Sequence, residues 1–243
     1  ALSKIGEKVN GGFRIASDPP VLVPLRDLSD DYRPDKLEAQ AQAAFESYRS
    51  SLPDDRKRLL DRYRPVDLAL KVVGVGSVGT RCLILLLEGR DRDDPLILQI
   101  KEATASVLED HLPASDYDLH GERVVQGQRL MQSESDIFLG WAQPTEGHHY
   151  YWRQLKDWKG SVDIDKVGRK GLSRYATVCG WTLAHAHARS GDPIAIAGYL
   201  GQGSVFVDAV AAFAEAYADQ NDADYDLFKA AIDDGRLEAR ADE

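Results

Sequence analysis

The stretch VVGVGSVGTRCLILLLEG, residues 72–89, decides the fold of the middle of the chain. Its glycines have the spacing G-x-G-x-x-G, which in many proteins wraps the phosphates of a nucleotide. A dinucleotide-binding loop stands between a strand and a helix, because the helix N-terminus holds the pyrophosphate. Here residues 82–87 are continuously apolar, which is typical of a buried strand. The pattern G-x-x-x-x-G-K-[ST] fails too, since Thr80 stands where lysine is required.

Strand patterns lie on both sides of these glycines. Residues 66–76, VDLALKVVGVG, alternate with a period of two, and residues 95–103, PLILQIKEA, form a third strand pattern after a charged turn. Alternation gives the third strand two faces, with Leu96, Leu98 and Ile100 on one and Ile97, Gln99 and Lys101 on the other. The order strand, glycine-rich turn, strand, strand predicts antiparallel pairing.

The same order is the setting of the protein-kinase glycine loop, which folds as a hairpin lid over the phosphates of ATP. On that interpretation Gly74, Gly76 and Gly79 let backbone amides approach the phosphate oxygens closely. Ser77 then lies at the tip of the loop. Lys101, on the third strand, is placed to contact the α- and β-phosphates under the lid.

Glu122 follows in the next predicted helix, where a kinase-like fold has the glutamate that pairs with this lysine. Each feature also has a plainer explanation. Glycines are common in kinked hairpins, and Lys101 can be a solvated lysine beside its own counter-charge, Glu102. An acidic residue near a helix N-terminus is favoured by the helix dipole whatever its function. The order of the three features along the chain favours the kinase-like interpretation.

The rest of the chain predicts an α+β protein. Residues 11–24 are rich in glycine and proline and predict an extended, irregular lead-in. Helices are expected from Pro34 to about residue 52, over residues 53–62 and over residues 120–133, and strands at DIFLGWAQ and HHYYWRQL, residues 136–143 and 148–155. Residues 171–243 are mostly helical in pattern. We expect a lead-in with helices over residues 1–65, a strand-rich lobe over 66–155 and a helical lobe over 156–243.

Composition limits the classes of function. The net charge of −10 and the absence of a basic run with interleaved aromatics argue against a nucleic-acid partner. The longest apolar run is far shorter than the roughly 20 residues of a membrane-spanning helix, so no membrane partner is expected. The N-terminus is polar, and Cys82 and Cys179 both lie in apolar sequence, which predicts a cytoplasmic protein.

A catalytic loop is harder to place. HAHARSGDP, residues 185–193, is nearest to a kinase catalytic loop, with His187, Arg189 and Asp192, but the asparagine that normally follows is missing. His187 lies beside an apolar stripe and is more readily a core or edge histidine. His148 and His149 open a strand after a turn and are expected to be exposed. No metal site is predicted, and the catalytic residues stay unknown.

Long blocks of the sequence closely resemble one bacterial family, known as domain of unknown function 2252. The blocks are VVGVGSVGTRC, PLILQIKEATASVLE, GERVVQGQRLMQSESDIFLGW, YYWRQLKDWKGS, CGWTLAHAHARSGD, IAGYLG and FAEAYADQNDADYDLF. The resemblance covers the chain from about Val66 onward and, more loosely, the DPPVLVPL lead-in. It implies a fold similar to protein kinases and aminoglycoside phosphotransferases, and it implies no established substrate.

The resemblance also implies a permuted order of motifs. Full-length members resemble kinases with the catalytic and metal-binding loops, G-D-A-H-x-x-N-F-G and N-D-F-D, placed before the glycine loop. This chain contains neither segment and is expected to be the C-terminal part of a member, an incomplete and permuted kinase-like fold. Arg153, Asp157 and Lys159 belong to the matched block RQLKDWKGS and are weaker site candidates.

Two functions remain open from the sequence. One is the nucleotide-binding part of a kinase-like phosphotransferase, with ATP and Mg²⁺ as cofactors and an unknown phosphoacceptor. The other is a non-catalytic kinase-like binding or interaction module, or a fragment that is inactive without its upstream segment. That N-terminal segment of the same protein is the partner expected in either case.

Overall fold

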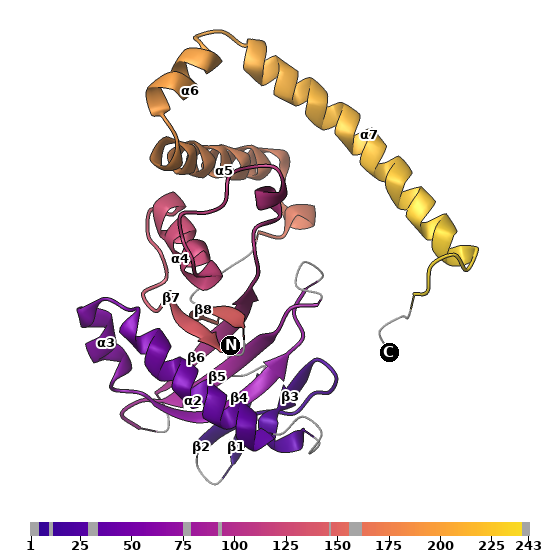
Figure 1. The fold of residues 1–243 in the computed structure, drawn as a ribbon. Helices are drawn as coiled ribbons and strands as arrows, with labels where there is room; N and C mark the ends of the chain where they lie inside the picture. Colours follow the sequence, from indigo (N-terminus) through magenta and orange to yellow (C-terminus); the bar gives the residue numbers. More distant parts are fainter. Residues whose placement is uncertain are drawn as a thin grey trace. The chain divides into compact units, whose positions relative to one another are not determined.

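The computed structural model describes residues 5–9, 12–28, 34–74, 79–91, 94–145, 147–155 and 162–239. The chain divides into two compact units, Ala1–Ser190 and Gly191–Glu243 (Figure 1). The described residues of the first unit form strands and helices, whereas those of the second form helices only. The division expected at residues 65 and 155 follows a change in sequence character and stays a prediction.

A sheet of six antiparallel strands is the centre of the first unit. Its strands lie in the order β3 (Leu22–Pro24), β4 (Arg64–Lys71), β5 (Cys82–Glu88), β6 (Pro95–Ala103), β8 (His148–Gln154) and β7 (Gly140–Thr145). The strand patterns on both sides of the glycines are therefore confirmed. The fold class is α+β, with an antiparallel sheet followed by a helical C-terminal region.

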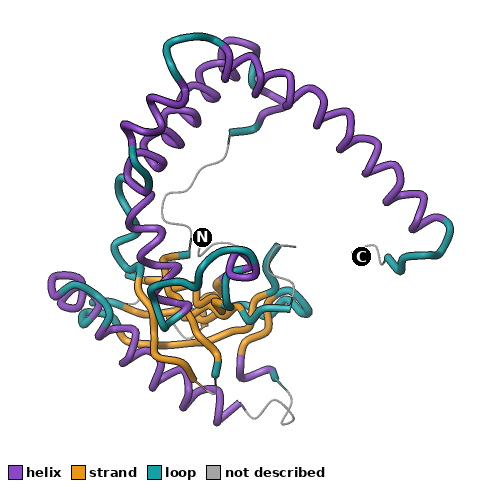
Figure 2. Tube along the Cα trace, turned by 45° about the horizontal axis from the view of Figure 1, so that its top comes forward, coloured by secondary structure: helices purple, strands orange, loops and turns teal. Residues whose placement is uncertain are grey.

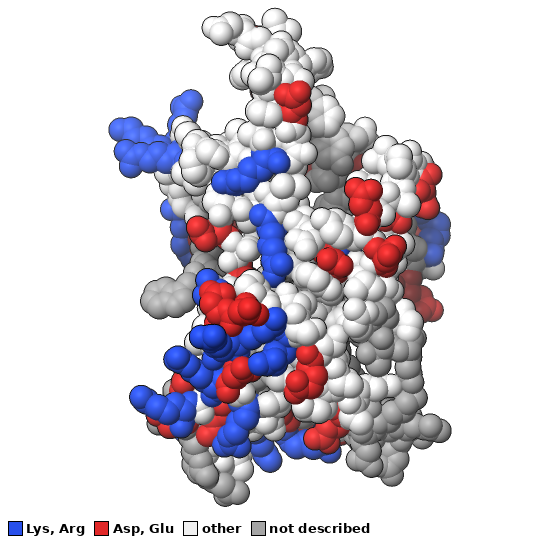
Figure 3. All heavy atoms as spheres, turned by 60° about the vertical axis from the view of Figure 1, so that its left-hand side comes forward, with Lys and Arg blue, Asp and Glu red and all other residues white. Residues whose placement is uncertain are grey.

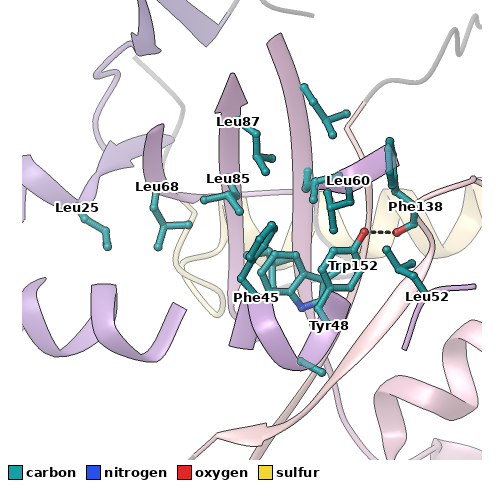
Figure 4. Packing of buried hydrophobic residues seen from close by; sticks show 14 residues of the cluster. Leu25, Phe45, Tyr48, Leu52, Leu60, Leu68, Leu85, Leu87, Phe138 and Trp152 are labelled. Carbon is teal, nitrogen blue, oxygen red and sulfur yellow. Dashed lines mark hydrogen bonds between the residues drawn. The ribbon is translucent and has the colours of Figure 1, made fainter. Parts of the chain in front are cut away.

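One face of this sheet packs against α2 (Pro34–Ser50) (Figures 1 and 2). The helical spacing of Phe45 and Tyr48 brings both rings onto the sheet, where they surround Trp152 of β8. α3 (Asp54–Leu60) follows and buries Leu60 in the same core. Figure 4 shows this core, in which the labelled side chains are Leu25, Phe45, Tyr48, Leu52, Leu60, Leu68, Leu85, Leu87, Phe138 and Trp152.

The opposite face is covered in part by a hairpin of β1 (Gly6–Val9) and β2 (Gly12–Ile15). The second core consists of Ile15, Leu22, Ala69, Ile84, Leu86 and Ile97. Asp67 fastens the hairpin, because its Oδ2 accepts the Ile15 N–H over 2.8 Å and also binds Arg26. The same face of the sheet extends past this second core to Cys82 and Lys101, next to the glycine-rich connection.

The lead-in is more ordered than its composition predicted. Residues 12–15 form β2, and β3 pairs antiparallel with β4, so the expectation of an irregular segment was wrong for these residues. The physical reason is the edge of β4, whose backbone N–H and C=O groups need partners. Pro24 ends the edge strand β3, a position that proline tolerates.

α4 (His120–Met131) packs against β6, β7 and β8. It approaches β8 so closely that a Cβ added to Gly121 would lie 2.3 Å from the Tyr150 carbonyl oxygen. β7 begins at Gly140, later than expected, because the carboxylate of Asp136 accepts the Phe138 N–H over 2.9 Å and its carbonyl accepts the Leu139 N–H over 3.0 Å. These bonds make residues 136–139 a turn.

The C-terminal helices confirm the predicted helical pattern. α5 (Arg169–Ser190) belongs to the first unit and contacts α4. In the second unit α6 (Pro193–Leu200) precedes α7 (Val205–Asp233), a continuous helix of 29 residues. In the described part of the chain no single helix is long and apolar enough to cross a bilayer; α6 and α7 reach that threshold only as a pair bent by 81°.

Candidate functional site: a basic sheet face beside the glycine-rich connection

The glycine-rich connection joins β4 to β5, and so lies within an antiparallel hairpin as the sequence predicted. Gly79 has a φ of 81°, in the left-handed region that favours glycine. Gly74 has open space where a Cβ would lie. Gly76 and Ser77 lie outside the described residues. An open pocket of about 740 Å³ adjoins the connection, with Lys71 and Gly79 in its lining.

Lys101 lies on the strand next to this hairpin, on β6, opposite Cys82 of β5 and Tyr151 of β8. The predicted alternation is confirmed, because Leu98 and Ile100 belong to the core under α2. Lys101 therefore belongs to the opposite face of the sheet, at the end nearest the glycine-rich connection.

Glu102 points to the other face and has partners of its own. Its Oε1 lies 2.6 Å from Nδ1 of His148, and its Oε2 accepts the backbone N–H of Arg81 over 2.9 Å. Burial would raise the pKa of this carboxyl, but the Arg81 N–H and His148 outweigh burial and lower it. Glu102 is thus no counter-charge for Lys101: it fastens the end of the glycine-rich connection to β8.

Glu122 lies in the first turn of α4, as predicted. The helix start is held by two contacts: the His120 N–H donates to Nδ1 of His149 over 3.2 Å, and Nη2 of Arg123 donates to the Thr104 carbonyl over 2.6 Å. Within the described residues no ion pair joins Glu122 to Lys101. The fold brings the helix of Glu122 against the sheet that carries Lys101, without forming the expected pair.

The two histidines that open β8 are half-buried, so the expectation that they are exposed was wrong. His148 meets Glu102, and the ring of His149 lies 4.6 Å from that of His120. Burial lowers the pKa of His149, and the neighbouring His120 and His148 lower it further. The sequence of a strand start after a turn suggests exposure, but here α4 packs against the start of β8.

A polar relay crosses the basic sheet face, which we define as Lys71, Cys82, Gln99, Lys101 and Arg153. Nε of Arg153 donates to Oε1 of Gln99 over 3.1 Å, and Nε2 of Gln99 lies 3.5 Å from Sγ of Cys82. Burial raises the pKa of the Cys82 thiol, against the opposing effects of Gln99 and the three cations. Sequence reasoning missed Lys71 and Gln99 as site residues, although continued alternation along β4 and β6 places both on the Lys101 face.

The other candidates are dispersed. Arg153 joins the basic sheet face, whereas Asp157 and Lys159 lie outside the described residues. Asp192 caps α6, because its Oδ1 accepts the N–H groups of Ile194 and Ala195 over 2.9 and 3.0 Å.

His187 and Arg189 lie near the end of α5. Nη2 of Arg189 donates to Oγ of Ser133 over 2.9 Å, and its Nη1 to the Met131 carbonyl. His187 is exposed rather than a core or edge residue, and Cys179 is exposed too. Within the first unit, the described apolar side chains beside His187 are also exposed, with Leu183 59% exposed.

In the described ranges no group of three or more histidine, cysteine or acidic side chains is placed to hold a metal ion.

The chain is an α+β protein. Its antiparallel sheet contains a glycine-rich hairpin with a basic face beside it, and a helical C-terminal region follows the sheet. The chain belongs to the family described as "Uncharacterized protein conserved in bacteria (DUF2252)", whose model matches residues 1–231. The match extends from residue 1, and so it includes the lead-in, where the sequence resemblance was looser than from Val66 onward. No curated protein and no solved structure matched the chain.

Proposed function

We propose that this chain is the nucleotide-binding part of a kinase-like phosphotransferase, with the glycine-rich connection as a lid over the phosphates of ATP. The proposal rests on the position of Lys101. It lies on β6, directly opposite Cys82, and Cys82 is the first residue of the hairpin's second strand, β5. A lysine in that position reaches phosphates held under backbone amides of the loop. Glu102 supports the lid by holding Arg81 at its end.

The basic sheet face suits the phosphates of ATP, because cations neutralise the charge that such groups carry. ATP supplies the phosphoryl group, and this chain's residues bind and orient it. We assign no residue as catalytic base or Mg²⁺ ligand, since the described residues contain no cluster for a metal ion.

The experiment is a thermal-shift titration of the whole chain with ATP and Mg²⁺. We expect ATP to raise the melting temperature, because a ligand that binds only the folded state stabilises it. Lys101→Ala should remove most of this shift, whereas Lys170→Ala, an exposed lysine of α5, should leave it unchanged. A wild-type protein that responds to no nucleotide would contradict the proposal.

A second function, that of an interaction module, is favoured by the apolar side chains that α7 exposes. Within the second unit Phe213, Tyr217 and Phe228 are each more than half exposed. Large exposed apolar side chains on one element are typical of surfaces that bind another protein. Phosphoryl transfer from ATP by the chain alone would contradict a purely non-catalytic role.

A further inference from the structure

The basic sheet face aligns three cations from three strands. Lys101 pairs with Cys82 on one side and Tyr151 on the other, and Arg153 lies two residues beyond Tyr151. The β4–β5 register ends at Leu70 and Leu83, and its next step places Lys71 opposite Cys82. Side chains at these positions share one face of the sheet. Lys101 and Arg153 are then diagonal neighbours about 7–8 Å apart.

Among the described residues, the strand positions between these three cations carry no carboxylate. The row through Lys101 contains Leu22, Lys71, Cys82, Tyr151 and Trp141, and the row through Arg153 contains Pro24, Ala69, Ile84 and Gln99. Among the described residues, the acidic residues nearest to these cations on the same face are Asp67 in the following row, which binds Arg26, and Asp18, which pairs with Leu22 at the end of the Lys101 row. Among the described residues neither Lys71 nor Arg153 forms an ion pair.

The basic sheet face belongs to an acidic protein. The chain has a net charge of −10, and on the molecular face drawn in Figure 3 basic side chains lie among acidic ones. Lys71 and Arg153, which form no ion pair with a described residue, contribute a local positive potential in an acidic protein, and such a potential attracts and concentrates anions. The basic sheet face is therefore selective for an anionic ligand.

A hydrogen bond to Gln99 orients the guanidinium of Arg153 before any ligand binds. Gln99 is 5% exposed, and its amide is engaged at both ends, by Nε of Arg153 and by Sγ of Cys82. A buried amide is stable only when it is hydrogen-bonded, so this relay fixes the plane of the guanidinium. Nη1 and Nη2 of Arg153 have no protein partner among the residues described. Together they present a planar fork of the kind that binds phosphate through two parallel hydrogen bonds.

We infer that Arg153, positioned by Gln99, is a phosphate-binding residue that acts together with Lys101, and that the ligand is a linear polyphosphate, free or as the tail of a nucleoside di- or triphosphate. Two cations on neighbouring strands, at diagonal positions of one face, can each bind a separate phosphate of a linked chain. Lys71, in the lining of the open pocket at the glycine-rich connection, extends the same cationic row. The nucleotide form of this inference rests on the proposed function.

Calorimetric titration of the whole chain tests it with five ligands: ATP, ADP, AMP, adenosine and inorganic tripolyphosphate, each with Mg²⁺. Arg153→Met keeps the length of the side chain and removes its charge, so we expect roughly tenfold to hundredfold weaker binding of ATP and tripolyphosphate. Adenosine binding should not change. Arg153→Lys and Gln99→Leu keep the charge but lose the fork or its orientation, and should give intermediate losses. Arg64→Met is the matched control, because Arg64 pairs with Glu88 at the opposite end of β5 from Cys82.

The outcomes separate the two claims. If ATP binds the wild-type chain and Arg153→Met equally well, Arg153 is not a phosphate ligand, while the nucleotide proposal stands. If tripolyphosphate binds as tightly as ATP and both depend on Arg153, the polyphosphate site stands and nucleotide selectivity fails. Failure of the wild-type chain to bind either ligand overturns both. Should Arg153→Met not fold, the fold-changes in Arg153→Lys and Gln99→Leu decide, with circular dichroism as the check on folding.

Discussion

The rings of Tyr48 and Trp152 stack with their centroids 4.5 Å apart and their planes 8° from parallel. Both side chains are fully buried, one from α2 and the other from β8. The Tyr48 hydroxyl also donates to the Phe138 carbonyl over 2.7 Å (Figure 4). Burial, and next the charge of Asp136, raise the pKa of Tyr48, so its hydroxyl stays a neutral donor. One residue thereby joins the helix, the sheet centre and the turn before β7.

Tyr48→Phe keeps the stacked ring and removes only the hydroxyl. The buried Phe138 carbonyl then loses its partner, so we expect the free energy of unfolding to fall by about 1–3 kcal/mol. Urea unfolding followed by fluorescence measures this change. Tyr199→Phe serves as the control, because Tyr199 is 84% exposed, and should change stability little. Equal stability of Tyr48→Phe and wild type would show that the buried bond contributes nothing net.

Two glycines of α4 predict opposite effects of the same substitution. Gly121→Ala would place a Cβ 2.3 Å from the Tyr150 carbonyl oxygen, a backbone atom, so the helix must move away from β8. We expect a loss of stability of about 1–3 kcal/mol from this overpacking. At Gly127 an added Cβ has open space, and Gly127→Ala should stabilise the helix by up to about 1 kcal/mol. Thermal unfolding of the pair checks the packing of α4, and a stabilised Gly121→Ala would contradict it.

The contact between His149 and the start of α4 predicts a pH dependence. Nδ1 of His149 accepts the His120 N–H only while it carries no proton, and the folded pKa lies below the ordinary 6.5. The unfolded chain therefore binds the proton more readily, so stability is full above about pH 6.5 and falls as the pH drops toward the folded pKa. Nearby charge comes from His120 of α4, His148 of the same strand and Glu102 of β6.

His149→Asn tests this dependence, because its side-chain oxygen can accept the same N–H but does not titrate in this range. Melting temperatures between pH 7 and pH 5 should fall less steeply for the variant than for wild type. Parallel curves for the two proteins would mean that His149 does not cause the loss.

Glu102 predicts a second, more acidic dependence. Its pKa is lowered below 4.5, so its contribution to stability is present above that value and is lost as the pH falls through the folded pKa. Glu102→Gln cannot make the ionic contact with His148 and should show a shallower loss between pH 5 and pH 3. Glu134→Gln, an exposed control, should behave as wild type does. If Glu102→Gln and wild type lose stability in parallel, the contact with His148 and Arg81 has no energetic role.

Local pattern was sufficient for most elements of this chain. The period of two over β4, β5 and β6 and the helical period over α2 reflect which side chains must leave water, and that information lies within a few neighbouring residues. Pairing of β3 with the edge of β4 was not predictable in this way. It depends on a partner strand about fifty residues away, and prolines in the lead-in suggested the opposite.

In the candidate site, too, some features were predictable from neighbouring residues and others depended on distant ones. The glycine spacing, the face on which Lys101 lies and the place of Glu122 in a first helical turn all followed from the sequence. The alignment of Lys71, Lys101 and Arg153, the orientation of Arg153 by Gln99 and the pairing of Glu102 with His148 did not. Each depends on the register between strands, which is set by packing of the whole sheet and not by any one segment. Residue types and faces are thus local properties of this chain, whereas the partners across its sheet exist only in the folded protein.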